Sequence, residues 1–179
     1  MKYLALLRGI NVGGNNKVPM TQLKECLEEL GYQNVSTYIN SGNAIFESDK
    51  SPEQIAKEIE VALPKKCGLT SVIKILVLTK QQLEHVIQHA PKGFGEDPDV
   101  YHSDVAFLLS VPSEEALKAF DLNPEVDMVW QGEAVIYYRR LSAKRTQSRL
   151  SKIIGKPIYK SMTIRNWNTT TKILALMGK

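Results

Sequence analysis

The stretch Val35–Phe46, VSTYINSGNAIF, decides the fold class, because two strand-like runs in it are separated by a tight turn. β-Branched and aromatic residues favour strands at residues 35–39 and 44–46. Asn40–Asn43 has the composition of a hairpin turn. The stretch therefore predicts an antiparallel pair of neighbouring strands.

Helical and strand patterns flank this hairpin. Residues 3–10 form a short apolar run that predicts a buried strand, and apolar residues at helical spacing over 23–30 predict a helix. Ser51 and Gln54 form a capping box at the start of a second helix. Residues 72–78 then read as a strand, which gives the order β-α-β-β-α-β.

The second half of the chain repeats this order. A connecting helix begins with a capping box at Thr79 and Gln82, and the polar segment 91–99 follows as a linker. Further elements are expected as a strand at 105–111, a helix capped by Ser113, a hairpin over 126–138, a short helix near 150–154, a strand at 162–165 and a terminal helix capped by Asn168.

The predicted fold class is α+β, a tandem pair of ferredoxin-like (split βαβ, βαββαβ) plaits with antiparallel sheets, a connecting helix and a C-terminal helix. We expect a first unit over residues 1–78, a connecting helix and linker over 79–103, and a second, basic unit over 104–179. The repeat lies in the order of elements and not in residue identities.

Charge is strongly segregated along the chain. Residues 1–133 carry 12 Lys and Arg against 19 Asp and Glu, whereas residues 134–179 carry 11 Lys and Arg and no acidic residue. Such a segment creates a positive field that attracts polyanions or an acidic partner. The alternative is that the basic segment packs beside the acidic one within the same fold.

Several protein classes are disfavoured by composition. No apolar run approaches the length of a membrane span, and the run at the start of the chain meets Arg8 too soon for a secretory signal. The two cysteines, Cys26 and Cys67, are too few for a disulfide scaffold. We therefore expect a cytoplasmic protein without a membrane partner.

Two loop clusters are candidate binding sites. In a split βαβ unit, the loop after the first strand and the turn between the second and third strands lie at the same end of the sheet. This brings together Arg8, Asn11, Gly13, Gly14, Asn40, Ser41, Gly42 and Asn43. Glycines allow backbone N–H groups to approach an anion. Glycine and asparagine also serve turns that need a positive φ, which is the structural alternative.

The second cluster lies in the basic unit. The same topology is expected to bring Arg139, Arg140, Lys144 and Arg145, placed in a loop, towards the exit of the last strand. Basic groups beside an indole suit phosphate contact and ring stacking. A core role for the indole is the alternative. The candidate residues here are Arg149, Arg165, Asn166, Trp167 and Lys172.

Three motifs in these clusters resemble those of an uncharacterised bacterial family, the domain of unknown function 1697. They are Leu6–Gly14 with Lys17–Met20 after it, Thr37–Asn43, and Thr163–Thr169 followed by Thr171 and Lys172. Ser148-Arg149-Leu150 is similar to the family's Ser-Lys-Leu, with Arg in place of Lys. The resemblance implies a cytosolic, tandem ferredoxin-like protein and no known reaction.

No catalytic signature accompanies these clusters. Walker A, dinucleotide and nucleophile-elbow motifs are absent, and the catalytic residues and cofactors stay unknown. His85 and His89 are four residues apart, but without a third ligand we expect no metal site.

Three functions remain open from the sequence. The first is binding of a phosphorylated ligand, nucleic acid or nucleotide, through the basic and Gly/Asn-rich loops. The second is an enzyme acting on a small anionic metabolite. The third is a protein-interaction module, such as a homodimer that pairs acidic and basic halves.

Overall fold

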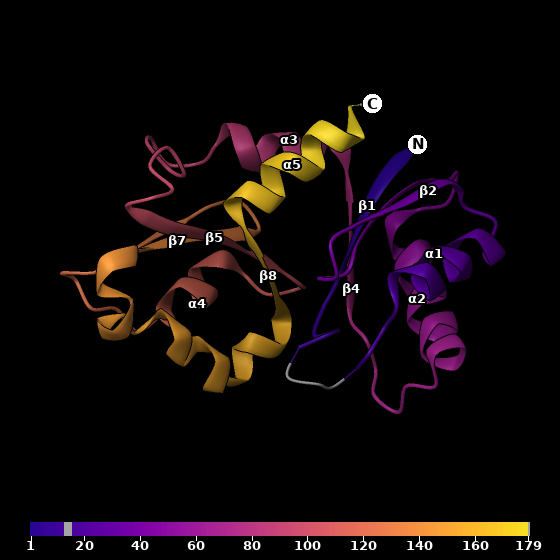
Figure 1. Cartoon of the computed structure of the whole chain (residues 1–179), viewed down its shortest axis with the longest axis horizontal. Coiled ribbons are helices and arrows are strands. Elements are labelled where there is room, and N and C mark those ends of the chain that lie inside the picture. Colours follow the sequence, from indigo (N-terminus) through magenta and orange to yellow (C-terminus); the bar gives the residue numbers. More distant parts are fainter. Residues whose placement is uncertain (13–15, 179) are drawn as a thin grey trace. The chain divides into compact units, whose positions relative to one another are not determined.

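The computed structural model describes residues 1–12 and 16–178, and it divides into two compact units. The first unit comprises Met1–Leu83 together with the end of the chain from Met177, and the second comprises Glu84–Leu176. The division falls inside α3 (Lys80–Gln88). Each unit contains one four-stranded antiparallel sheet, which confirms the predicted α+β class (Figure 1).

In the first unit, the strand order is β2-β3-β1-β4. The elements are β1 (Lys2–Leu7), α1 (Met20–Glu29), β2 (Gln33–Tyr38), β3 (Asn43–Glu47), α2 (Pro52–Cys67) and β4 (Ile75–Thr79). Both helices cover the same face of the sheet (Figure 1). Their apolar stripes, with Leu23 and Leu27 from α1 and Ile55 and Ile59 from α2, are completely buried.

Capping boxes determine where α2 and α3 begin. Gln54 N donates to Ser51 Oγ and Ser51 N donates to Gln54 Oε1, which is the predicted capping box. The Thr79 and Gln82 pair makes the same two hydrogen bonds ahead of α3. These boxes satisfy N–H groups that have no partner within the first turn of a helix.

The second sheet repeats the first, with the strand order β6-β7-β5-β8. Its elements are β5 (Tyr101–Leu108), α4 (Ser113–Lys118), β6 (Asp127–Gln131), β7 (Val135–Leu141), three 3₁₀ helices η1 (Ser142–Gln147), η2 (Leu150–Gly155) and η3 (Pro157–Ser161), β8 (Met162–Asn166) and α5 (Trp167–Met177). The equivalent strand orders confirm the tandem βαββαβ arrangement.

Strand alternation gives the second sheet two different faces. One face carries Ala106, Ile136 and Tyr138, which pack with α4 and η2 in a hydrophobic cluster. The opposite face carries Tyr137, which meets Phe94 edge-on at 5.5 Å between ring centroids. Tyr137 OH also donates to Val86 O at 2.6 Å, so the second half of α3 is held on this face as well.

Several boundaries differ from those predicted. β5 begins at Tyr101, four residues before the expected Val105, because pairing with β7 extends the strand into a polar stretch. Ser113 is the first residue of α4 and makes no cap; Pro112 occupies the N-cap. The expected loop containing Arg139 and Arg140 is the end of β7. No helix in the described part of the chain has the length and apolar character to span a membrane.

Candidate functional site

The first loop cluster comes together as the topology predicts. Leu7 N donates to Gly42 O at 2.8 Å, so the end of β1 meets the β2–β3 turn. Asn11 Nδ2 donates to Asn40 O at 2.9 Å and links the following loop to the same turn. Gly13 and Gly14 lie outside the described residues.

The asparagine side chains in this cluster bind the protein's own backbone. Asn11 Nδ2 also donates to Val18 O, and Asn11 Oδ1 accepts from Val18 N at 2.8 Å. Asn43 is completely buried, and its Nδ2 donates to Tyr38 O and to Ser41 Oγ, both at 2.9 Å. These amides stabilise the turns, which leaves them few hydrogen-bonding positions for a ligand.

Gly42 is required by the same turn. Its φ is 76°, and a Cβ atom would lie 2.7 Å from Ile10 Cδ1 and 2.8 Å from Leu7 Cβ. Arg8 is half-buried, and its backbone N–H donates to Lys74 O. An open hollow of about 420 Å³ adjoins the cluster, lined by Asn11, Lys17, Val18, Pro19, Met20 and Asn40.

The cations of the second unit occupy different environments. Arg139 lies on the Phe94 face of the sheet, with its guanidinium carbon 3.9 Å from the centroid of the Tyr101 ring and its Nη1 donating to Gly93 O. Arg165 is only 7% exposed and donates from Nη1 to Thr163 Oγ1 and Ile164 O. Burial lowers the pKa of Arg165 to about 10, so it stays charged at neutral pH. Neither guanidinium is a freely solvated group.

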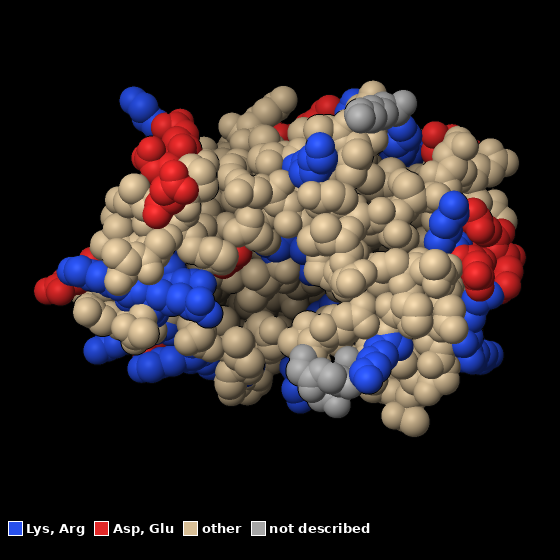
Figure 2. All heavy atoms as spheres, viewed as in Figure 1, with Lys and Arg blue, Asp and Glu red and all other residues tan. Residues whose placement is uncertain are grey.

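Four other cations are exposed on consecutive elements. Lys144 and Arg145 lie on η1, Arg149 lies between η1 and η2, and Lys152 lies on η2. We call these four residues the basic surface. Figure 2 shows blue side chains gathered at the left of the view, where η1 and η2 lie in Figure 1.

The Asp121 carboxylate contacts two side chains of the basic surface, and Asp127 Oδ2 accepts from the backbone N–H of Arg149. Asp121 Oδ2 lies 2.8 Å from Lys152 Nζ, and Asp121 Oδ1 lies 3.8 Å from Arg149 Nη1. The hydrogen bond from Lys152 holds the pKa of Asp121 below its ordinary value. Lys144 and Arg145 form no ion pair with any residue that the structure describes. Lys172 is exposed on α5, apart in sequence from the basic surface.

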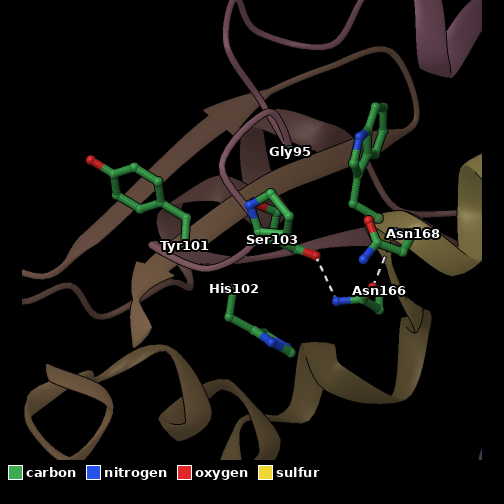
Figure 3. A pocket seen from close by; sticks show the side chains of 8 residues that line it. Gly95, Tyr101, His102, Ser103, Asn166 and Asn168 are labelled. Carbon is green, nitrogen blue, oxygen red and sulfur yellow. Dashed lines mark hydrogen bonds between the residues drawn. The ribbon is translucent and has the colours of Figure 1, made fainter. Parts of the chain in front are cut away.

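A pocket of about 60 Å³ forms at one end of the second sheet (Figure 3). It is lined by Gly95, Pro98, Tyr101, His102, Ser103, Asn166, Trp167 and Asn168. Asn166 Nδ2 donates to Ser103 O at 3.1 Å, and Asn166 Oδ1 accepts from Asn168 N at 3.0 Å. Asn166 therefore joins β5 to the start of α5, where Asn168 was expected to act as the cap.

Trp167 forms one wall of this pocket. Its ring meets Phe94 edge-on at 5.0 Å between centroids, and the indole is half-buried. Gly95 lies against it so closely that a Cβ atom would be 2.0 Å from Trp167 Cδ1. The indole therefore packs against Phe94 and also borders the pocket. The packing agrees with the core role, and the stacking of a ligand ring on the indole stays a prediction.

Of the predicted residues, Asn166 and Trp167 share this pocket, whereas Arg149 lies on the basic surface. Sequence reasoning missed Tyr101 and Ser103. The only available signal was the alternation of Tyr101 and Ser103 with His102 and Asp104 ahead of the apolar part of β5.

Other reactive side chains form no evident site. The rings of His85 and His89 stack at 3.9 Å between centroids, and His85 Nε2 lies 2.9 Å from Glu133 Oε2. Within residues 1–12 and 16–178, no group of three His, Cys, Asp or Glu side chains is placed to hold a metal ion. Cys26 and Cys67 are free thiols, and burial raises the pKa of each.

Comparison with known proteins gives a family but no activity. No curated protein matches the chain. The conserved bacterial protein SP0830 from Streptococcus pneumoniae is similar in structure, with a TM-score of 0.78, 27% sequence identity, and 98% of each chain covered. Residues 1–137 match the model of a family described as a protein of unknown function, DUF1697. The chain therefore belongs to the DUF1697 family.

Proposed function

We propose that this protein binds nucleic acid through the basic surface of its second unit, with the phosphate backbone as the main contact. The observation that carries the proposal is the exposure of Lys144, Arg145, Arg149 and Lys152 within nine residues. The segment that contains them has no acidic residue of its own. Clustered cations on a surface attract phosphates by releasing the counterions condensed around the nucleic acid.

The position of the basic surface supports a backbone contact. The short 3₁₀ helices η1 and η2 present these side chains to solvent, while Leu150 and Ile153 anchor the segment in the core. Lys144 and Arg145 pair with no described carboxylate, whereas Arg149 and Lys152 reach Asp121 and would exchange this carboxylate for a phosphate. Long cationic side chains fixed at their base suit an extended series of phosphates. Arg165 is too deeply buried to contribute such a contact.

A small anionic metabolite at the first loop cluster is the weaker candidate. The hollow beside Asn11 carries a single cation, Lys17, among its lining residues. The amides of Asn11 and Asn43 are already engaged by neighbouring backbone and hydroxyl groups. The geometry therefore favours nucleic acid at the basic surface over a metabolite at this hollow.

The test is a fluorescence anisotropy titration of a labelled single-stranded oligonucleotide at increasing salt. If each of the four cations neutralises one phosphate, the plot of log affinity against log salt has a slope of about −2.8. The double variant Lys144→Gln/Arg145→Gln should reduce the magnitude of this slope by about 1.4.

Lys118→Gln is the matched control, because Lys118 is an exposed cation of the same unit that pairs with Glu114 on α4. It should leave the slope unchanged. Salt-independent binding, or an equal loss of affinity in the control, would contradict the proposal. Absence of binding at low salt would also contradict it.

A further inference from the structure

The pocket beside Trp167 contains a buried hydroxyl with no hydrogen-bond partner in the described protein. Ser103 is 5% exposed, its side chain lines the pocket, and its Oγ accepts and donates no hydrogen bond there. A buried polar atom without a partner costs free energy, and native proteins have few of them. The hydroxyl is therefore unsatisfied, and because its oxygen is itself buried, a group in the pocket reaches it only when the adjoining side chains shift.

The wall opposite the indole is held rigidly. Tyr101 lines the pocket, and the Arg139 guanidinium stacks over its ring at 3.9 Å. Arg139 is itself fixed by its hydrogen bond to Gly93 O. The pocket thus has two preformed aromatic walls, from Tyr101 and Trp167, and a polar floor.

The polar groups of the pocket are uncharged or weakly basic. They comprise the Ser103 hydroxyl, the amides of Asn166 and Asn168, and the His102 imidazole. No Lys or Arg that the structure describes lines the pocket, and Pro98 lies within the acidic run Glu96–Asp99. This composition disfavours a phosphate and favours a neutral planar ring with hydrogen-bonding edges.

The size of the pocket agrees with one such ring. The pocket is small, at about 60 Å³. Its size suits the edge of one planar ring and is too small for a base pair. An unpaired base stacked on an aromatic side chain is the usual mode of single-strand recognition.

The pocket adjoins the segment that carries the basic surface. Tyr101 pairs with Leu141 at the end of β7, and Ser142 N donates to Val100 O at 2.9 Å. η1 therefore begins beside the residue that precedes Tyr101. A strand whose phosphates contact Lys144 and Arg145 would have a base near the mouth of the pocket.

We propose that the pocket formed by Tyr101, Ser103, Asn166 and Trp167 receives one unpaired base of a single-stranded nucleic acid. This inference rests on the proposed function, because the basic surface supplies the phosphate contacts. The protein should accordingly prefer a single strand to a duplex and an intact strand to one that lacks bases.

The experiment compares three labelled 12-mers by anisotropy at constant salt: an intact single strand, the same strand with abasic residues, and the duplex. The protein should bind the intact strand about 5-fold to 100-fold more tightly than the abasic strand. Ser103→Ala should reduce this difference by about 2-fold to 10-fold, as expected for the loss of one hydrogen bond, without changing the salt slope. Asn168→Ala should act in the same direction.

Ser113→Ala is the matched control, because its hydroxyl lies on α4 and accepts from Gln131 Nε2 outside the pocket. It should preserve the difference between intact and abasic strands. Equal affinity for the two strands, or a Ser103→Ala variant that keeps the full difference, overturns the base pocket. If binding in that case still weakens with salt and with Lys144→Gln/Arg145→Gln, only the base pocket is rejected and the proposed binding through the basic surface is kept. If no strand binds at low salt, both proposals fail.

Discussion

Ser103 and Arg139 are direct cross-strand neighbours on β5 and β7, and each buries a polar atom that has no hydrogen-bond partner within the described protein. The two atoms are Ser103 Oγ and Arg139 Nε. Cross-strand neighbours point to the same face of a sheet, here the face that packs against Phe94. The paired residues thus place two unsatisfied groups under the 91–99 segment, beside the candidate base pocket.

Ser103→Ala should leave the free energy of unfolding within about 0.5 kcal/mol of the parent value, because no protein hydrogen bond is lost. Thr163→Val is the matched comparison, since Thr163 Oγ1 accepts a hydrogen bond from the buried Arg165 guanidinium. That substitution should cost about 1.5–3 kcal/mol. Urea unfolding monitored by circular dichroism measures both. A loss of similar size in the two variants would show that the Ser103 hydroxyl has a structural partner.

Gly42→Ala should destabilise the first unit by about 2–5 kcal/mol, because the new methyl group meets Ile10 and Leu7 in a backbone with positive φ. Gly155→Ala is the control, as a Cβ atom there meets nothing within 4 Å. The control should change stability by less than about 1 kcal/mol. Urea titration of both variants tests the pair, and equal midpoints would contradict the tight turn.

The sequence predicted the structure correctly where the interacting residues lie close together in the chain. The capping boxes Ser51/Gln54 and Thr79/Gln82 span three residues each, so the pattern contains all the interacting groups. The β2–β3 turn follows from the small and polar residues of Asn40–Asn43 for the same reason. Convergence of the first loop cluster then followed from topology alone, and the Asn11 to Asn40 hydrogen bond agrees with it.

Two residues of the candidate pocket, Tyr101 and Ser103, escaped sequence reasoning because their place in the structure depends on distant partners. Tyr101 and Ser103 belong to β5 only through pairing with Leu141 and Arg139 on β7. The start of β5 is polar, and its residues were therefore assigned to the linker. Charge alone also gave no means of distinguishing Arg165, which is buried on β8, from Lys144, which is exposed on η1, since burial is decided by tertiary packing.

Glu58→Gln should lower stability at neutral pH and have less effect in acid. Glu58 accepts hydrogen bonds from Lys50 Nζ and from Tyr32 OH. Both bonds hold the pKa of Glu58 below its ordinary value, and the bond from Lys50 has the larger effect. A depressed pKa adds stability above the unfolded value of about 4.3, and this contribution is lost as the pH falls through the folded value.

The expected loss at pH 7 is about 0.5–1 kcal/mol, because a third of the Glu58 side chain is exposed and water screens the pair. Urea midpoints of the variant and parent should converge as the pH is lowered to about 3. Glu114→Gln, in an exposed helix pair with Lys118, is the control and should show a smaller difference. If the difference between the urea midpoints of variant and parent grew as the pH fell, it would contradict a pKa of Glu58 that folding lowers.

Asp121→Asn should tighten nucleic-acid binding, because Asp121 is the carboxylate that contacts Arg149 and Lys152 on the basic surface. Removing one negative charge at about 8 Å from a phosphate is worth roughly 2-fold in affinity in water. The gain should shrink as salt rises above about 0.15 M, where the Debye length is about 8 Å. Glu114→Gln makes the same change in net charge on α4, where its partner is Lys118. Anisotropy titrations at low salt therefore separate a local effect from an effect of overall charge. If the effect is local, Asp121→Asn increases the affinity more than Glu114→Gln does. Equal increases in affinity would place the bound strand away from η1 and η2.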